Sequence, residues 1–293
     1  MIAQIFSILA PVLTCVLIGL VWVWRGRSYD TGMVSTLVMY IGAPCLIIAS
    51  LGKITLSAEA LLEIAWLYAA VLMITALVAG LLIWWLRAPP RIYLSAMIFP
   101  NTGNLGLPLT MLAFGEQGLV LGLAWYMLNS IGHFSVGVVL VSGKSLWREL
   151  LTNPVVISIF IAVALVVTEL SLPVWVFNTT DLIGAITIPM MLITLGVSLG
   201  QLKIGGLRRA TLFALLRLLL GFAVGFAVCE AFAIEGVLRG VVLIQSSMPV
   251  AVFNYLFAVR YRQGEQEVAG MVVMSTALAF ALLPLLLGYL LAG

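Results

Sequence analysis

Charged residues are scarce in this sequence: they make up 9% of 293 residues, whereas an ordinary soluble domain is about 25% charged. The chain also lacks a long polar tract and any Gly-X-Y period, which excludes a disordered or collagen-like protein. Hydrophobic residues, in contrast, account for 63% of the chain. This composition excludes a water-soluble globule and predicts a protein that crosses a lipid bilayer several times.

Cysteine and histidine are almost absent, with three copies and one copy respectively. Cys15, Cys45 and Cys229 lie in apolar stretches, without a C-x-x-C pair or a histidine at ligand spacing. We therefore expect no disulfide framework, no metal site and no cofactor. A basic face for nucleic acid is missing, as are the motifs G-x-S-x-G and H-E-x-x-H and paired aspartates, so the chain is expected not to be an enzyme.

Apolar stretches long enough to span a bilayer occur ten times, because a core of about 30 Å needs roughly 20 helical residues. They lie at about 4–24, 31–52, 60–86, 92–114, 117–142, 154–170, 179–202, 210–232, 237–259 and 268–291. The expected fold class is an all-α membrane protein with ten transmembrane helices.

Positive charges gather in the loops that follow the odd-numbered stretches, which hold 11 of the 14 Lys and Arg residues. These residues are Arg25, Arg27, Arg87, Arg91, Lys144, Arg148, Lys203, Arg208, Arg209, Arg260 and Arg262. The other loops are mainly acidic. The positive-inside rule then predicts that both termini face outside. The short loops leave no room for a soluble catalytic domain and suit a bacterial cytoplasmic (inner) membrane.

Matching prolines indicate an internal repeat. Pro44 and Pro189 lie 145 residues apart in the second and seventh stretches, and Pro108 and Pro249 lie 141 apart in the fourth and ninth. The chain is thus expected to form two five-helix repeats, 1–142 and 154–293, joined by a cytoplasmic linker at 143–153. Because five is odd, the two repeats are inverted in the membrane, which is typical of transporters.

The fourth and ninth stretches carry helix breakers and polar residues near their midpoints. Proline and glycine destabilise a helix there, and the freed backbone groups must line a polar cavity or pack against protein. If the two spans cross at their breaks, two helix N-termini converge and favour an anion. The expected substrate-binding residues are Asn101, Thr102, Gly103, Asn104, Gly106, Pro108, Ser246, Ser247, Pro249 and Asn254. The alternative is that the prolines are ordinary kinks and the polar side chains join helices.

Three further residues are candidates for anion binding or coupling. Arg217 lies in the eighth stretch, where a charge is a functional candidate, although its side chain could instead extend to the cytoplasmic interface. His133 and Asn129 lie one turn apart in the fifth stretch and suit a proton relay, or simple packing against a neighbouring helix. No carboxylate lies beside either break.

The segment Asn101-Thr-Gly-Asn-Leu-Gly-Leu-Pro108 resembles the N-x-G-x-x-G-x-P signature of the auxin efflux carrier family, within the bile acid, arsenite and auxin carrier-like superfamily. Met248-Pro249-Val-Ala251-Val-Phe-Asn254 is similar to that family's second-half motif, and the resemblance covers the whole chain in span count and proline placement. Asn104 stands where the pattern has a bulky apolar or aromatic side chain, which indicates a more polar pocket.

The resemblance implies a crossover fold, with spans 1, 2, 6 and 7 as a dimerising scaffold. Spans 3–5 and 8–10 would form a transport domain that moves as an elevator. It also implies transport of organic carboxylates such as malonate, malate or auxin-like acids. We therefore expect a homodimeric secondary active or facilitative carrier of small organic anions in a lipid bilayer. A sodium-coupled carrier of the bile-acid type is one alternative, and a channel or sensor for neutral solutes is another.

Cysteine accessibility tests the predicted orientation. In a background without the native cysteines, Arg87→Cys and Lys203→Cys should be labelled from the cytoplasm by a membrane-impermeant maleimide, and Glu116→Cys from outside. Labelling of Glu116→Cys only from the cytoplasm would contradict the topology and the inversion of the repeats.

Overall fold

The computed structural model describes residues 2–53, 58–143, 172–203 and 205–292, with Ile157, Ile161, Ala164 and Thr168 between them. This described part is helical apart from loops and one isolated bridge, so the expected all-α class is confirmed for it. Its elements are α1 (Ile2–Trp24), α2 (Thr31–Leu37), η1 (Val38–Gly42), α3 (Ala43–Lys53), α4 (Ala58–Trp85), α5 (Pro90–Ile98), η2 (Thr102–Gly106), α6 (Leu107–Gly132), η3 (His133–Gly137), α7 (Val138–Ser142), α10 (Val174–Gln201), α11 (Leu207–Ala231), α12 (Gly236–Ser246), α13 (Val252–Tyr261) and α14 (Glu265–Ala292).

Six helices of the described part are long and apolar enough to cross a membrane. They are Ile2–Trp24, Glu59–Trp85, Thr102–Ser142, Val174–Gln201, Leu207–Ala231 and Glu265–Leu291. One of them, Thr102–Ser142, contains a non-helical residue, Gly115 (φ 63°, ψ −149°), between the expected fourth and fifth spans. The expected sixth span, apart from four residues, and the linker after Gly143 lie outside the described residues.

Two interruptions divide expected spans into half-helices. The chain leaves the helix between α5 and η2, within the expected fourth span, and again between α12 and α13, within the ninth. Proline explains both positions, since Pro100 and Pro249 have no backbone N–H and disfavour a helical residue before them. The second expected span is continuous through Pro44, with the π-helix η1 just before it.

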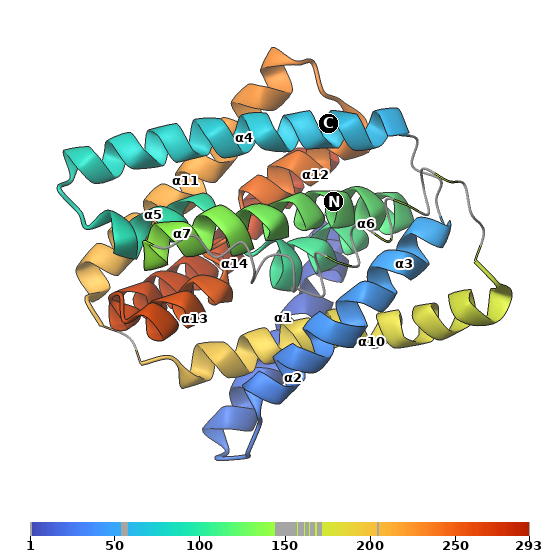
Figure 1. Cartoon of the computed structure of the whole chain (residues 1–293), viewed down its shortest axis with the longest axis horizontal. Coiled ribbons are helices and arrows are strands. Elements are labelled where there is room, and N and C mark those ends of the chain that lie inside the picture. The colour runs from blue at the N-terminus through green and yellow to red at the C-terminus, as the bar shows by residue number, and fades with distance from the viewer. Residues whose placement is uncertain are drawn as a thin grey trace.

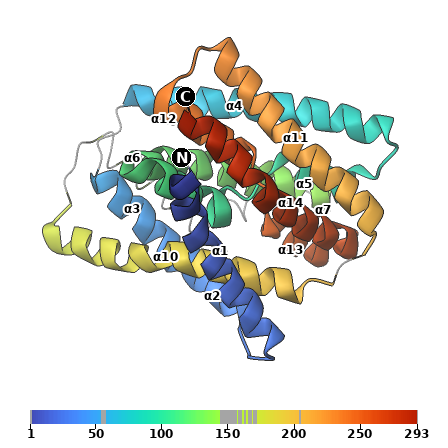
Figure 2. The same cartoon turned by 180° about the vertical axis from the view of Figure 1, so that it is seen from behind.

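The helices form two groups (Figures 1 and 2). In the first group, α10 packs against both α1 and α3. The contact with α1 is unusually close: a Cβ at Gly19 would meet the Ile193 carbonyl oxygen, and a Cβ at Gly196 would meet the Val16 carbonyl oxygen. Only glycine lets these two backbones touch, so α1 and α10 form a tight pair.

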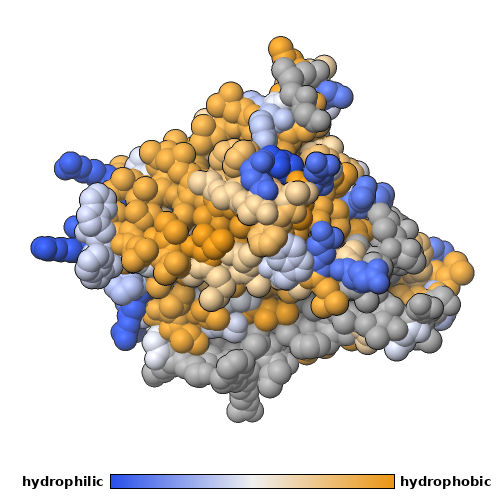
Figure 3. All heavy atoms as spheres, turned by 90° about the horizontal axis from the view of Figure 1, so that it is seen from above, coloured by the Kyte–Doolittle hydropathy of each residue, from blue (hydrophilic) through white to orange (hydrophobic). Residues whose placement is uncertain are grey.

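The second group has its own apolar core. Among the described residues, the buried members of this core come from α4, α5, α6, α11, α12, α14 and adjoining loops, and none comes from α1, α2, α3 or α10. Val252 and Tyr255 of α13 are partly buried against it. A second, smaller core joins the two groups, for example through Val12 of α1, Leu195 of α10 and Leu283 of α14. Figure 3 shows a broad apolar surface between hydrophilic side chains on either side, as expected for helices that contact lipid.

Glycine replacement tests the α1–α10 contact. Gly19→Ala and Gly196→Ala should each lower stability by about 1–3 kcal/mol, because the added methyl group overlaps backbone atoms. Gly80→Ala is the matched control, since a Cβ there meets nothing within 4 Å and alanine favours the helix by up to about 1 kcal/mol. The measurement is the melting temperature of the purified protein in detergent; equal melting temperatures for all three variants would contradict the close contact.

Candidate functional site

The two helix breaks meet. Pro100 and Val250 form an antiparallel bridge, the Asn101 backbone N–H donates to the Pro249 carbonyl (2.7 Å), and the Ala251 N–H donates to the Phe99 carbonyl (3.5 Å). These contacts place the extended segment after α5 beside the segment before α13. Residues about 150 positions apart in the chain therefore complete each other's backbone hydrogen bonding.

Side chains satisfy the carbonyl groups freed at the first break. Asn254 Nδ2 donates to the Phe99 carbonyl (3.2 Å), and Asn129 Nδ2 donates to the Pro100 carbonyl (3.5 Å) and to Thr102 Oγ1 (3.0 Å). Asn101 Oδ1 accepts from the Asn104 backbone N–H (3.2 Å) and so caps the start of η2. Three predicted asparagines thus hold the backbone of this break.

The second break is completed by two residues of other helices. Arg217 Nη2 of α11 donates to the Ser246 carbonyl (2.9 Å), at the C-terminal end of α12, where a cation is favourable. The usual helical donor to that carbonyl would be the Val250 N–H, which instead donates to Ser275 Oγ of α14 (3.0 Å). Arg217 is 1% exposed, so its side chain lies against the break and does not extend to the interface.

His133 joins the network around Asn254. Ser95 Oγ donates to Asn254 Oδ1 (2.7 Å), and His133 Nε2 lies 3.1 Å from the same oxygen. Because Oδ1 only accepts, His133 Nε2 carries the hydrogen. The imidazole also stacks on Phe99, with ring centroids 4.8 Å apart. His133 is the first residue of the π-helix η3. Such π-helical turns are common at functional sites.

Several buried polar atoms of the described residues have no hydrogen-bond partner. Near the breaks they are Asn101 Nδ2, Asn129 Oδ1, Arg217 Nε, Arg217 Nη1, Gln245 Oε1 and Ser247 Oγ. An unpaired buried group costs about 1–3 kcal/mol, and more if charged, so such atoms are uncommon in a finished core. Four of these six can donate a hydrogen bond, which makes the region suited to an anion.

Glycines let side chains approach the first break. A Cβ at Gly103 would lie 2.8 Å from a ring carbon of Tyr126, and one at Gly106 would overlap Gln245 Oε1. Pro108 lies in the first turn of α6, where proline is well tolerated. These predicted residues shape the site, whereas the asparagines supply its polar atoms.

The structure separates the predicted residues into two sets. His133 and Asn129 lie at the first break with Asn101, Thr102 and Asn254, while Arg217 contacts the second break beside Ser246. Among the described residues, no group of three or more His, Cys, Asp or Glu side chains could hold a metal ion.

Three contributors were not predicted from the sequence: Ser95, Gln245 and Ser275. Gln245 is completely buried and donates to the Gly122 carbonyl (3.4 Å), which ties α12 to α6. Its only sequence signal is an amide in an apolar stretch directly before Ser246. The two serines carry no local signal, because a single serine is common in membrane helices.

Removing Ser275 should destabilise the second break. Ser275→Ala leaves the buried Val250 N–H without an acceptor, at a cost of about 1–3 kcal/mol. Thr276→Val is the matched control on the same helix, since its buried hydroxyl donates only to the Val272 carbonyl of its own helix. A melting temperature measured in detergent should fall more for Ser275→Ala; an equal fall in both variants would indicate that the hydrogen bond contributes nothing specific.

Comparison with known proteins agrees with these features. The sequence model of a family described as "membrane transport protein" matches residues 135–287. An uncharacterized transporter of Methanocaldococcus jannaschii is 25% identical over 196 residues, 63% of each chain, so the match spans less than two thirds of that relative's length. An uncharacterized transporter of Methanothermobacter thermautotrophicus is 26% identical over 294 residues, 94% of each chain. The chain belongs to the membrane transport protein family, which is the auxin efflux carrier family that its motifs resemble.

Proposed function

We propose that this transporter carries small organic anions, such as malonate, malate or auxin-like acids, and binds them where the two breaks meet. The observation that carries this proposal is the set of buried donors there without partners: Asn101 Nδ2, Ser247 Oγ and two nitrogens of Arg217. Among the described residues, no carboxylate pairs with Arg217, so an anion would supply the missing charge. The N-terminal ends of η2 and α13 add favourable dipoles.

The proposed architecture is two inverted five-helix repeats whose fourth and ninth spans are crossover helices. The backbone bridge between Pro100 and Val250 supports this arrangement, as do matching breaks in the two halves. The proposed units are 1–142, the linker 143–153 and 154–293, with both termini outside a bacterial cytoplasmic membrane. A partner of the same kind would bind along the scaffold, giving a homodimer.

Elevator movement is the proposed mechanism of alternating access. The large core, whose buried residues come from α4–α6, α11, α12, α14 and adjoining loops, supports a transport domain that moves as one body. The tight pair of α1 and α10 supports a scaffold. The contact between them is apolar, as in the cluster of Val12, Leu195 and Leu283, and so has few directional bonds to break during sliding.

Coupling to protons or sodium is a separate question from anion binding. His133 Nε2 donates to Asn254 Oδ1, and Asn254 Nδ2 donates to the Phe99 carbonyl at the first break. A change in the protonation of His133 would therefore act on the break itself. Sodium coupling lacks such an observation, since the polar atoms near the breaks are amide, hydroxyl and carbonyl groups and a guanidinium. A channel or sensor for neutral solutes would leave Arg217 without a counter-charge.

Binding to the purified protein tests the anion site. Asn101→Ala should weaken malonate binding about 10–150-fold, because one hydrogen bond to a charged ligand contributes about 1.5–3 kcal/mol. Asn178→Ala is the matched control, since Asn178 is an exposed asparagine of α10, away from the breaks. Isothermal titration calorimetry should show binding of malonate but much weaker binding of malonamide. Equal affinity for acid and amide would favour a carrier of neutral solutes.

Substitutions of Arg217 test how much of the affinity for the anion comes from its positive charge. Arg217→Lys keeps the cation and should retain more dicarboxylate affinity than Arg217→Gln. A larger loss for malonate than for acetate in Arg217→Gln would place the guanidinium on the second carboxylate. If both variants bind malonate like the wild type, Arg217 serves only the Ser246 carbonyl. Saturation and counterflow in proteoliposomes would distinguish a carrier from a channel.

A further inference from the structure

A groove of about 340 Å³ lies between α11 and α14 and reaches the second break. Its walls are almost entirely apolar and include Leu218, Phe222, Ala279, Leu282 and Tyr289. Leu219 and Leu285 at its rim are 54% and 71% exposed, so the groove opens sideways, towards the lipid. Ala279 and Tyr289 are ten residues apart on α14, which gives a length of about 15 Å.

The inner end of the groove is polar. Ser247 lines it, and the Ser247 hydroxyl is buried without a partner. Directly before Ser247 in the chain, the Ser246 carbonyl accepts from Arg217 Nη2, while Nε and Nη1 of the same guanidinium have no partner in the described part of the chain. The apolar groove therefore leads from the lipid to a hydroxyl, backed by a cation, and neither group has a partner for its unused donors among the described residues.

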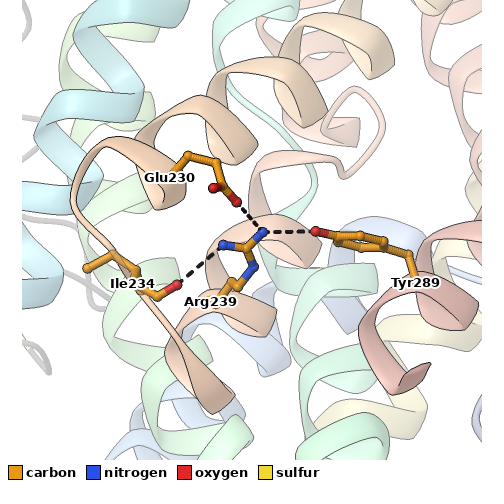
Figure 4. Close-up of polar contacts among 4 residues, drawn as sticks. All are labelled: Glu230, Ile234, Arg239 and Tyr289. Carbon is orange, nitrogen blue, oxygen red and sulfur yellow. Dashed lines mark hydrogen bonds and ion pairs between the residues drawn. The ribbon is translucent and has the colours of Figure 1, made fainter. Parts of the chain in front are cut away.

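The outer end differs, because its cation is already paired. Arg239 Nη2 donates to Glu230 Oε1 (2.6 Å) and to the Tyr289 hydroxyl (2.8 Å), as Figure 4 shows. Arg239 also lies over the Phe226 ring, 5.4 Å from its centroid. An anionic headgroup at this end would have to compete with Glu230. The positive charge of Arg217, in contrast, lies behind the inner end of the groove. An acyl chain of a phospholipid would place only its methyl terminus there.

We propose that this groove binds an aliphatic monocarboxylate of medium chain length, with the chain between α11 and α14 and the carboxylate towards Ser247 and Arg217. The complementarity is specific: a long apolar groove fits the chain, and the Ser247 hydroxyl at its inner end fits the carboxylate. The Arg217 guanidinium, bonded to the adjoining Ser246 carbonyl, adds a positive charge behind it. The proposal rests on the proposed anion-carrier function and extends its substrate class to amphipathic acids that enter from the lipid side.

Blocking the groove separates chain recognition from anion recognition. In nanodiscs, Leu282→Trp should weaken octanoate binding about tenfold or more, because the indole fills the groove, and should leave malonate affinity unchanged. Leu77→Trp is the matched control, since Leu77 is exposed on α4, away from the groove. Ser247→Ala should weaken octanoate about 10–150-fold, as expected for one lost hydrogen bond to an anion. Unchanged octanoate affinity in Leu282→Trp would overturn the proposal.

Photocrosslinking tests the wild-type chain directly. A fatty acid with a terminal diazirine should label α11 and α14 residues that line the groove, and excess octanoate should prevent labelling while octanamide should not. Equal competition by octanoate and octanamide would mean that an acyl chain alone is recognised and would overturn the proposal. If malonate fails to bind while octanoate still competes, the proposal for the groove is supported. The proposed site for small dicarboxylates at the crossing of the breaks is then contradicted.

Discussion

The need to satisfy every backbone N–H and carbonyl group inside a membrane governs the centre of this structure. A broken helix exposes such groups where water cannot reach them, and each one costs several kcal/mol in hydrocarbon. Here the two breaks are placed against each other, so that Asn101 and Pro249, and Phe99 and Ala251, share backbone hydrogen bonds. The remaining groups are satisfied by side chains from four other elements, among them Arg217 and Ser275.

This constraint also sorts the polar side chains by role. Asn254 accepts from Ser95 and His133 and donates to Phe99, so its amide is committed to structure. Asn101 uses its oxygen as a helix cap and leaves its nitrogen unused. Arg217 uses one nitrogen and leaves two. The donors open to a ligand are therefore those that no backbone group uses, namely Asn101 Nδ2 and two nitrogens of Arg217.

The sequence predicts the breaks well because proline, glycine and asparagine act locally, and their effect on a helix needs no knowledge of neighbours. It also predicts that the breaks require polar partners. It does not predict which residues those are: Ser95, Gln245 and Ser275 are single polar residues in apolar helices, and only packing brings them to the site. The depth of Arg217 follows from its position in the chain, but the direction of its side chain depends on the carbonyl freed at Ser246.

The pairing of the breaks has a consequence for how the chain is assembled in the membrane. When the chain up to Ser142 has left the ribosome, the Asn254 amide that donates to the Phe99 carbonyl has not yet been made. Neither has the Pro249 carbonyl that accepts from the Asn101 N–H. The Val250 N–H in turn has its acceptor, Ser275, on α14. The first break thus stays unfinished until the second arrives, and the second until α14 is inserted. The residues around the first break therefore cannot complete it alone, and the centre of the protein closes only after α14 has been made.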